Sequence, residues 1–206
     1  MERGRGRILA WVGGVIATIV LLAIGITYIV IGANGRSEVH RTISREQIVG
    51  TPDMTPQAIV AEAHQSGLKV VPDVPTCSVA GVAITDGSKA KCFASYMRIH
   101  ALEASGGQTC AQMGRYLDKS GKPTNDQAAA AKDSKTGQPV SNPARDLWVT
   151  ETALSTGLDM SYFAEQVSLS AIVMGAALVV IGIGLVVVTV FTLGLMPWRA
   201  KPSPSS

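Results

Sequence analysis

ILAWVGGVIATIVLLAIGITYIVIG, residues 8–32, and VSLSAIVMGAALVVIGIGLVVVTVFTLGL, residues 167–195, are the two stretches that decide the fold of this chain. Neither stretch contains an Asp, Glu, Lys, Arg or His residue. A helix needs about 20 apolar residues to cross the hydrocarbon core of a bilayer. Both stretches are therefore long enough to span a membrane, and the second is long enough to tilt or to project beyond it.

These stretches have two other interpretations. The first stretch could be a cleaved signal peptide, but the apolar region of a signal peptide is only about 7–15 residues long. Both stretches could be buried helices of a soluble core, although uncharged runs of this length are typical of membrane spans. We therefore expect two uncleaved transmembrane helices.

The charges that flank the two stretches predict their orientation. Three arginines within residues 1–7 precede the first stretch, and Arg199 and Lys201 follow the second. Positively charged flanks remain in the cytoplasm, so we expect a two-span plasma-membrane protein with both termini cytoplasmic. The residues between the spans carry 13 Lys and Arg against 14 Asp and Glu. This balance gives no basic stripe, so nucleic acid is not an expected partner.

These observations predict a mainly α fold: a hairpin of two transmembrane helices with a small, mostly helical extracytoplasmic domain that carries short β pieces. The predicted parts are a cytoplasmic N-terminal tail at 1–7, transmembrane helix 1 at 8–32, the extracytoplasmic domain at 33–166, transmembrane helix 2 at 167–196 and a cytoplasmic C-terminal tail at 197–206. The external segment is long enough for one small domain and not for two.

Small residues recur four positions apart within both spans. Gly13 and Ala17 form one such pair, and Ala171 and Gly175 form the other. This spacing lets helix backbones approach closely in lipid, so these residues are candidates for packing the two spans together or onto a partner protein. Glycine and alanine are also simply common in membrane helices. Neither span holds an acidic or basic side chain, so conduction of ions or protons by this chain alone is not expected.

The external segment contains several short patterns. We expect helices at 56–66, 89–105 and 109–117, β-like pieces at 36–43, 68–71 and 78–84, and a mobile loop at 119–138. Asn142-Pro143 has the capping residue and first-position proline of a helix start. We expect this last helix to continue into the second span, with a possible kink at Gly157.

All three cysteines lie in the external segment, where an oxidising compartment permits disulfides. Our preferred pair is Cys77 and Cys92, which would close a loop of about 15 residues and stabilise the domain by about 3 kcal/mol. Other pairings remain open, because sequence alone does not choose among three cysteines. Cys110 would then be buried or would bond to another chain. A zinc site of the cysteine type is not expected without a close pair.

Catalytic and cofactor motifs are missing from the sequence. It has no nucleophile elbow, phosphate-binding loop or dinucleotide fingerprint, so we assign no catalytic residue and no cofactor. The candidates for metal binding are His100 and Glu103, which share one helix face at a spacing that metal sites use. A non-haem iron site would also need a second histidine, His40 or His64, from a distant segment.

Three segments carry a family resemblance. They are Phe93–Gly107 (FASYMRIHALEASGG), Asn142–Leu154 (NPARDLWVTETAL) followed by Ser161–Glu165 (SYFAE), and Pro123–Asp126 (PTND). With the two spans they resemble a group of actinobacterial two-span membrane proteins of unknown function, often labelled aromatic ring-opening dioxygenases. The resemblance implies the hairpin architecture and a Gram-positive cell envelope, and it transfers no catalytic residue.

Three functions are consistent with these features. The first is a non-catalytic accessory, scaffold or interaction subunit, whose partners are the lipid bilayer and another membrane or envelope protein. The second is an extracytoplasmic ligand-binding or sensor module. The third is a metal-dependent ring-opening dioxygenase that would use His100 and Glu103. We favour the first, because the chain has paired anchors and no catalytic spacing.

Overall fold

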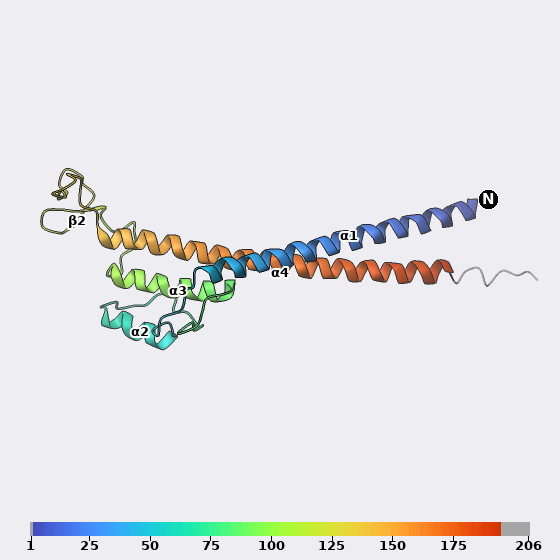
Figure 1. Cartoon of the computed structure of the whole chain (residues 1–206), viewed down its shortest axis with the longest axis horizontal. Helices are drawn as coiled ribbons and strands as arrows, with labels where there is room; N and C mark the ends of the chain where they lie inside the picture. Colours follow the sequence, from blue (N-terminus) through green and yellow to red (C-terminus); the bar gives the residue numbers. More distant parts are fainter. Residues whose placement is uncertain (1, 195–206) are drawn as a thin grey trace, which may run out of the picture. The chain divides into compact units, whose positions relative to one another are not determined.

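The computed structural model describes residues 2–194 of the 206-residue chain, and it confirms the mainly helical class. The helices are α1 (Glu2–Arg45), α2 (Pro56–Gln65), α3 (Gly87–Ala104) and α4 (Pro143–Gly194), and the strands are β1 (Tyr116–Leu117) and β2 (Pro123–Thr124), as Figure 1 shows. The chain divides into two compact units. One comprises Met1–Ser37 with Gln166–Ser206, and the other comprises Glu38–Glu165.

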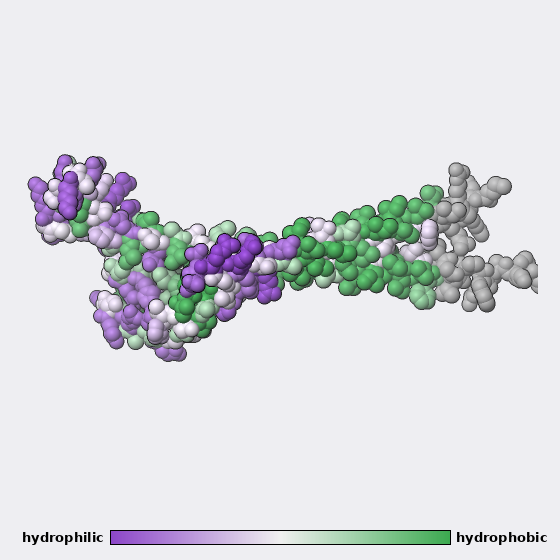
Figure 2. All heavy atoms as spheres, viewed as in Figure 1, coloured by the Kyte–Doolittle hydropathy of each residue, from purple (hydrophilic) through white to green (hydrophobic). Residues whose placement is uncertain are grey.

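The first unit contains the apolar stretches. Both α1 and α4 are long and apolar enough to cross a membrane. Only 11% of the most apolar window of each helix is buried, and hydrophobic residues cover these segments in the view of Figure 2. The predicted C-terminal tail, 197–206, lies outside the described residues.

The predicted strand at 36–43 is wrong, because α1 continues through it to Arg45. Val39 and Ile43 suggested alternation, but they are also four residues apart and so share one helix face. Ile43 is buried in the core of the second unit and Val39 packs against that core. Adding residues to a helix that already exists costs less than nucleating a new element, which favours the extension.

Local signals set the ends of α2 and α3. Thr55 caps α2 by accepting a hydrogen bond from the Ala58 amide at 3.2 Å, and Pro56 occupies the first turn. Asp86 caps α3 by accepting one from the Lys89 amide at 2.9 Å. These ends fall within two residues of the predicted helices 56–66 and 89–105, although the prediction did not identify Asp86 as the cap of α3.

The core of the second unit lies around α2 and α3, which pack side by side (Figure 1). Its largest fully buried side chains are Tyr96, Met54, Ile59, Ile84, Ile99 and Val79. The Tyr96 hydroxyl donates a hydrogen bond to the Cys77 carbonyl at 2.6 Å. The predicted disulfide between Cys77 and Cys92 is confirmed, and it joins this loop to α3. Cys110 is a half-buried free thiol.

Two predictions for the external loops are wrong. The segment 109–117 forms turns and then β1 instead of a helix, and β1 pairs antiparallel with β2. Gln112 does accept a hydrogen bond from the Thr109 amide, but Gly114 lies directly against the backbone of Thr124, which leaves no room for a helical turn. The pieces at 68–71 and 78–84 form no strand; Ala80 and Ala83 make only isolated bridges.

The helix predicted from Asn142-Pro143 is confirmed and continues through the second apolar stretch to Gly194. The buried Asn142 side chain fixes the start of α4 with two hydrogen bonds. It accepts a hydrogen bond from the Ala144 amide at 3.2 Å and donates one to the Gly114 carbonyl at 3.0 Å. Gly157 is helical like its neighbours.

Candidate functional site

The apolar segments of α1 and α4 come into backbone contact at glycine residues. A Cβ atom added to Gly175 would lie 2.5 Å from the Gly25 carbonyl oxygen, and one added to Gly25 would lie 2.8 Å from the Gly175 oxygen. One added to Gly32 would lie 2.5 Å from the Ser168 oxygen. Backbones this close require glycine, as expected for small-residue packing in lipid.

The four predicted packing residues lie in different environments. Gly175 is buried in this contact and Ala171 is half-buried beside it. Ala17 is exposed, and a Cβ atom on Gly13 would meet nothing within 4 Å. The contacting face of α1 passes instead through the neighbouring Gly14, which faces Thr189.

A seven-residue repeat identifies the contacting residues that the four-residue spacing did not identify. Small residues recur every seven positions in both helices, at Thr18, Gly25 and Gly32 and at Ser168, Gly175, Gly182 and Thr189. Because seven residues are close to two helical turns, such a repeat keeps one stripe facing its partner over a long distance.

Glu165 joins three helices at one edge of the second unit. This residue is 4% exposed, and its Oε1 lies 3.0 Å from Nε2 of His40 on α1. Its Oε2 accepts a hydrogen bond from the Gly87 amide, the first residue of α3, at 2.7 Å. A carboxylate at a helix N-terminus is stabilised by the unpaired amides there. His40 therefore has a structural partner.

His100 is the centre of a second polar cluster. Its Nδ1 lies 3.0 Å from Oε2 of Glu103, and its Nε2 lies 2.9 Å from Oδ2 of Asp53. One ligand atom each from Asp53, Glu62 and His100 lies within 4.8 Å of the others. The structure thus brings the predicted pair His100 and Glu103 together with two further carboxylates.

The second histidine that an iron site of the two-histidine type needs is not at this cluster. His40 lies against Glu165, and Nδ1 of His64 lies 2.9 Å from the Leu68 carbonyl oxygen. Sequence reasoning missed Asp53 and Glu62 because they lie 47 and 38 residues before His100 along the chain and on different segments. No local spacing indicates that they converge.

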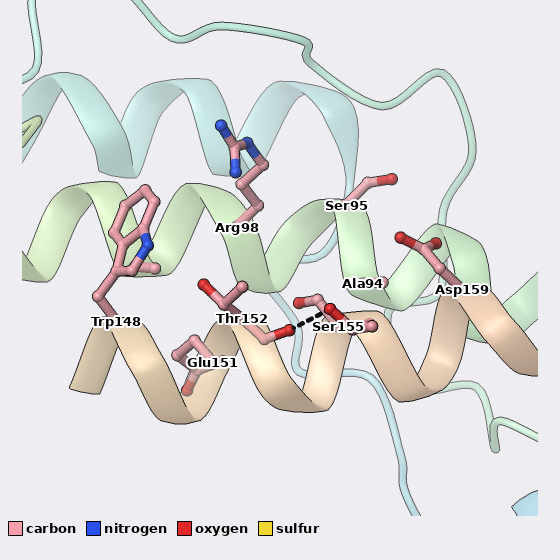
Figure 3. A pocket seen from close by; sticks show the side chains of 10 residues that line it. Ala94, Ser95, Arg98, Trp148, Glu151, Thr152, Ser155 and Asp159 are labelled. Carbon is pink, nitrogen blue, oxygen red and sulfur yellow. Dashed lines mark hydrogen bonds between the residues drawn. The ribbon is translucent and has the colours of Figure 1, made fainter. Parts of the chain in front are cut away.

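A polar cleft of about 210 Å³ lies between α3 and α4 (Figure 3). Arg98 on α3 lies over Trp148 on α4, with its Cζ 5.6 Å from the ring centroid. Ser155 and Asp159 on α4 extend the lining. The cleft offers a cation, an aromatic ring, hydroxyl groups and a carboxylate, a mixture that suits a small polar ligand.

The surroundings of Glu151, in the same cleft, disfavour the ionised form of its carboxyl group. Burial raises the pKa of its carboxyl, and the charge of His100 offsets only part of that increase. Its Oε2 is buried without a hydrogen-bond partner in the described part of the chain. Ionised Glu151 therefore lowers the stability of the folded unit, because a buried charge without a partner is costly.

We expect Glu151→Gln to stabilise the protein at pH 7.5 by about 1 kcal/mol or less, because solvent screens part of the charge. The folded protein binds the Glu151 proton more tightly than the unfolded chain, so the destabilisation grows as pH rises from about 4.5 through the raised pKa. The stability difference between Glu151→Gln and the wild-type protein should vanish at about pH 4. Thermal unfolding of the detergent-solubilised protein at both pH values tests this, with the exposed Glu46→Gln as the charge control. Equal or lower stability of Glu151→Gln at pH 7.5 would contradict it.

Comparisons with known proteins give no relative: no family model matches the chain, and no curated protein or solved structure is significantly similar to it.

Proposed function

We propose that this is an integral membrane protein with two spans and two cytoplasmic termini, which acts as a non-catalytic accessory or interaction subunit of a cell-envelope complex. In this proposal the unit Glu38–Glu165 is extracytoplasmic, and its partner is another membrane protein.

The burial of the apolar helices supports membrane insertion. A core helix of a soluble protein is mostly buried, whereas only 11% of each apolar window of α1 and α4 is buried. Exposed apolar surface on this scale is favourable only against lipid or another protein. The Cys77–Cys92 disulfide supports an oxidising compartment for the second unit, and the basic flanks support cytoplasmic termini.

Three exposed apolar side chains on the part of α4 before residue 166 are the observation that carries the interaction role. Val149, Met160 and Phe163 are 51%, 58% and 60% exposed. Their spacings of eleven and three residues place them on one face of the helix. This region is not part of the uncharged stretch, because it includes the exposed Asp159. A helix of a partner protein that covered this face would remove the three side chains from water.

A cross-linking experiment in the native membrane tests the interaction role. A photo-reactive amino acid at Phe163 should cross-link to a second protein, whereas the same group at the exposed loop residue Ser134 should not. Mild detergent extraction and native mass measurement should then recover the complex. A strictly monomeric particle, with no cross-link from Phe163, would contradict the proposal.

Labelling of single cysteines in intact cells tests the topology separately. With Cys110 replaced by serine, Ser134→Cys should react with a membrane-impermeant maleimide from outside. Ser205→Cys should react only after the membrane is opened. The reverse pattern would contradict the orientation.

A second candidate is the ligand-binding or sensor module, and the cleft between α3 and α4 favours it. Arg98 and Asp159 supply opposite charges and Trp148 supplies an aromatic wall. If the cleft binds a small polar ligand, Arg98→Ala should weaken binding in a small-molecule screen by thermal shift, and Lys69→Ala outside the cleft should not.

A further inference from the structure

We infer that Asp53, Glu62 and His100 form a binding site for a divalent transition-metal ion, with Glu103 as the residue that orients His100. The three ligands come from different parts of the second unit: the loop before α2, α2 itself and α3. One ligand atom from each lies within 4.8 Å of the other two, so small side-chain movements would bring all three within reach of one ion. The inference is independent of the proposed interaction role.

The orientation of His100 is the first argument. Glu103 is on the same face of α3 one turn later, and its Oε2 lies 3.0 Å from Nδ1 of the imidazole. A hydrogen bond from Nδ1 to this carboxylate leaves the Nε2 lone pair pointing at Asp53. Proteins commonly hold metal-binding histidines by such a carboxylate contact on the second ring nitrogen. Glu103 suits this role because its side chain is only 9% exposed and therefore fixed.

The unsatisfied oxygen atoms are the second argument. Asp53 Oδ2 and Glu103 Oε1 are buried and accept no hydrogen bond in the part of the chain described. Asp53 Oδ2 lies 2.9 Å from Nε2, yet the contact does not meet hydrogen-bond geometry. Buried carboxylate oxygens without partners are rare in folded proteins and need an explanation. A cation bound by both Asp53 Oδ2 and His100 Nε2 supplies one for the Asp53 oxygen.

The balance of charge is the third argument. Three carboxylates, those of Asp53, Glu62 and Glu103, surround one imidazole, which carries at most a single positive charge. A divalent cation would offset the excess negative charge, and Glu62, which is partly exposed on α2, would close on the ion from the solvent side.

The chemistry of the ligands selects the ion. Imidazole favours Zn²⁺, Fe²⁺ and related ions, whereas Ca²⁺ and Mg²⁺ prefer sites made only of oxygen ligands. One imidazole with two carboxylates therefore suits Zn²⁺ or Mn²⁺, and water would complete the coordination. The competing explanation is a doubly protonated His100 that pairs with Asp53 and Glu103 and binds no metal.

Metal titration of the full-length protein in detergent separates these explanations. After chelator treatment, ZnCl₂ should bind at about one ion per chain, as measured by calorimetry, and should raise the unfolding temperature. MnCl₂ should compete for the site, and CaCl₂ and MgCl₂ should not. Absence of saturable Zn²⁺ binding would overturn the inference.

Three variants assign the site. His100→Gln should abolish Zn²⁺ binding. Glu62→Gln should weaken it about tenfold or more. The metal-free variant should unfold at the same or a slightly higher temperature than the metal-free wild type, because Glu62 lies outside the core and its charge repels the other carboxylates. His64→Gln is the matched control, since His64 lies on the same helix as Glu62 but faces Leu68. Unchanged affinity in Glu62→Gln, or loss of binding in His64→Gln, would overturn the inference.

Discussion

Replacing Cys77 and Cys92 together by alanine should lower the free energy of unfolding of the second unit by about 3 kcal/mol, the value expected for a disulfide that closes a 15-residue loop. The bond connects the loop before residue 80 to α3, and few regular hydrogen bonds hold that loop in place among the described residues. Without the bond, the unfolded chain gains conformational freedom that folding must then remove.

Thermal or denaturant unfolding in detergent measures this loss, with Cys110→Ala as the control because Cys110 is a free thiol. The double variant should still fold, since the hydrogen bond from Tyr96 to the Cys77 carbonyl remains. Treatment of the wild-type protein with a reductant should lower its stability by the same amount as the double substitution. An unfolding temperature equal to that of Cys110→Ala would show that the disulfide does not support the unit.

Gly175→Leu, within the apolar segments, should destabilise the protein by about 3 kcal/mol. The first atom of any side chain there would lie 2.5 Å from the Gly25 carbonyl oxygen and 2.9 Å from the Ile29 amide nitrogen. Both obstacles are backbone atoms, which move only if the helices separate. The close backbone contact between Gly175 and Gly25 would then be lost.

The matched control is Gly184→Leu, the same substitution on the same helix at a glycine with nothing within 4 Å of an added Cβ atom. Both variants add the same apolar volume, so they differ only in where it lies. Resistance of the purified protein to unfolding by a denaturing detergent should fall for Gly175→Leu and stay near wild type for Gly184→Leu. An equal loss of resistance in both variants would rule out close backbone packing as the reason why Gly175→Leu is destabilising.

Local signals made much of this fold predictable. The capped starts of α2, α3 and α4, the two long apolar helices and the disulfide all depend on residues that are close in sequence. The segment 36–43 was mispredicted because Val39 and Ile43 fit both a strand and a helix face, and only the attachment to α1 favours the helix. The segment 109–117 has a capping signal, but contact with β2 overrides it.

The polar cluster shows where sequence reasoning ends. The spacing of His100 and Glu103 could be recognised, because both lie on one helix. Asp53 and Glu62 could not be assigned to the same place, because their convergence depends on how α2 packs against α3. The cleft with Arg98 and Trp148 has the same origin, since its walls come from helices separated by about 40 residues.

The seven-residue repeat of small residues leaves the alignment of its two helices ambiguous. If one helix slid by seven residues in one direction, Gly25 would face Gly182 and Gly32 would face Gly175, so this repeat alone does not select the observed alignment. Contacts that do not repeat must select one of them, much as a single polar residue fixes the alignment of a coiled coil. The pair of His40 on α1 and Glu165 on α4 occurs once along these helices and is suited to that selection.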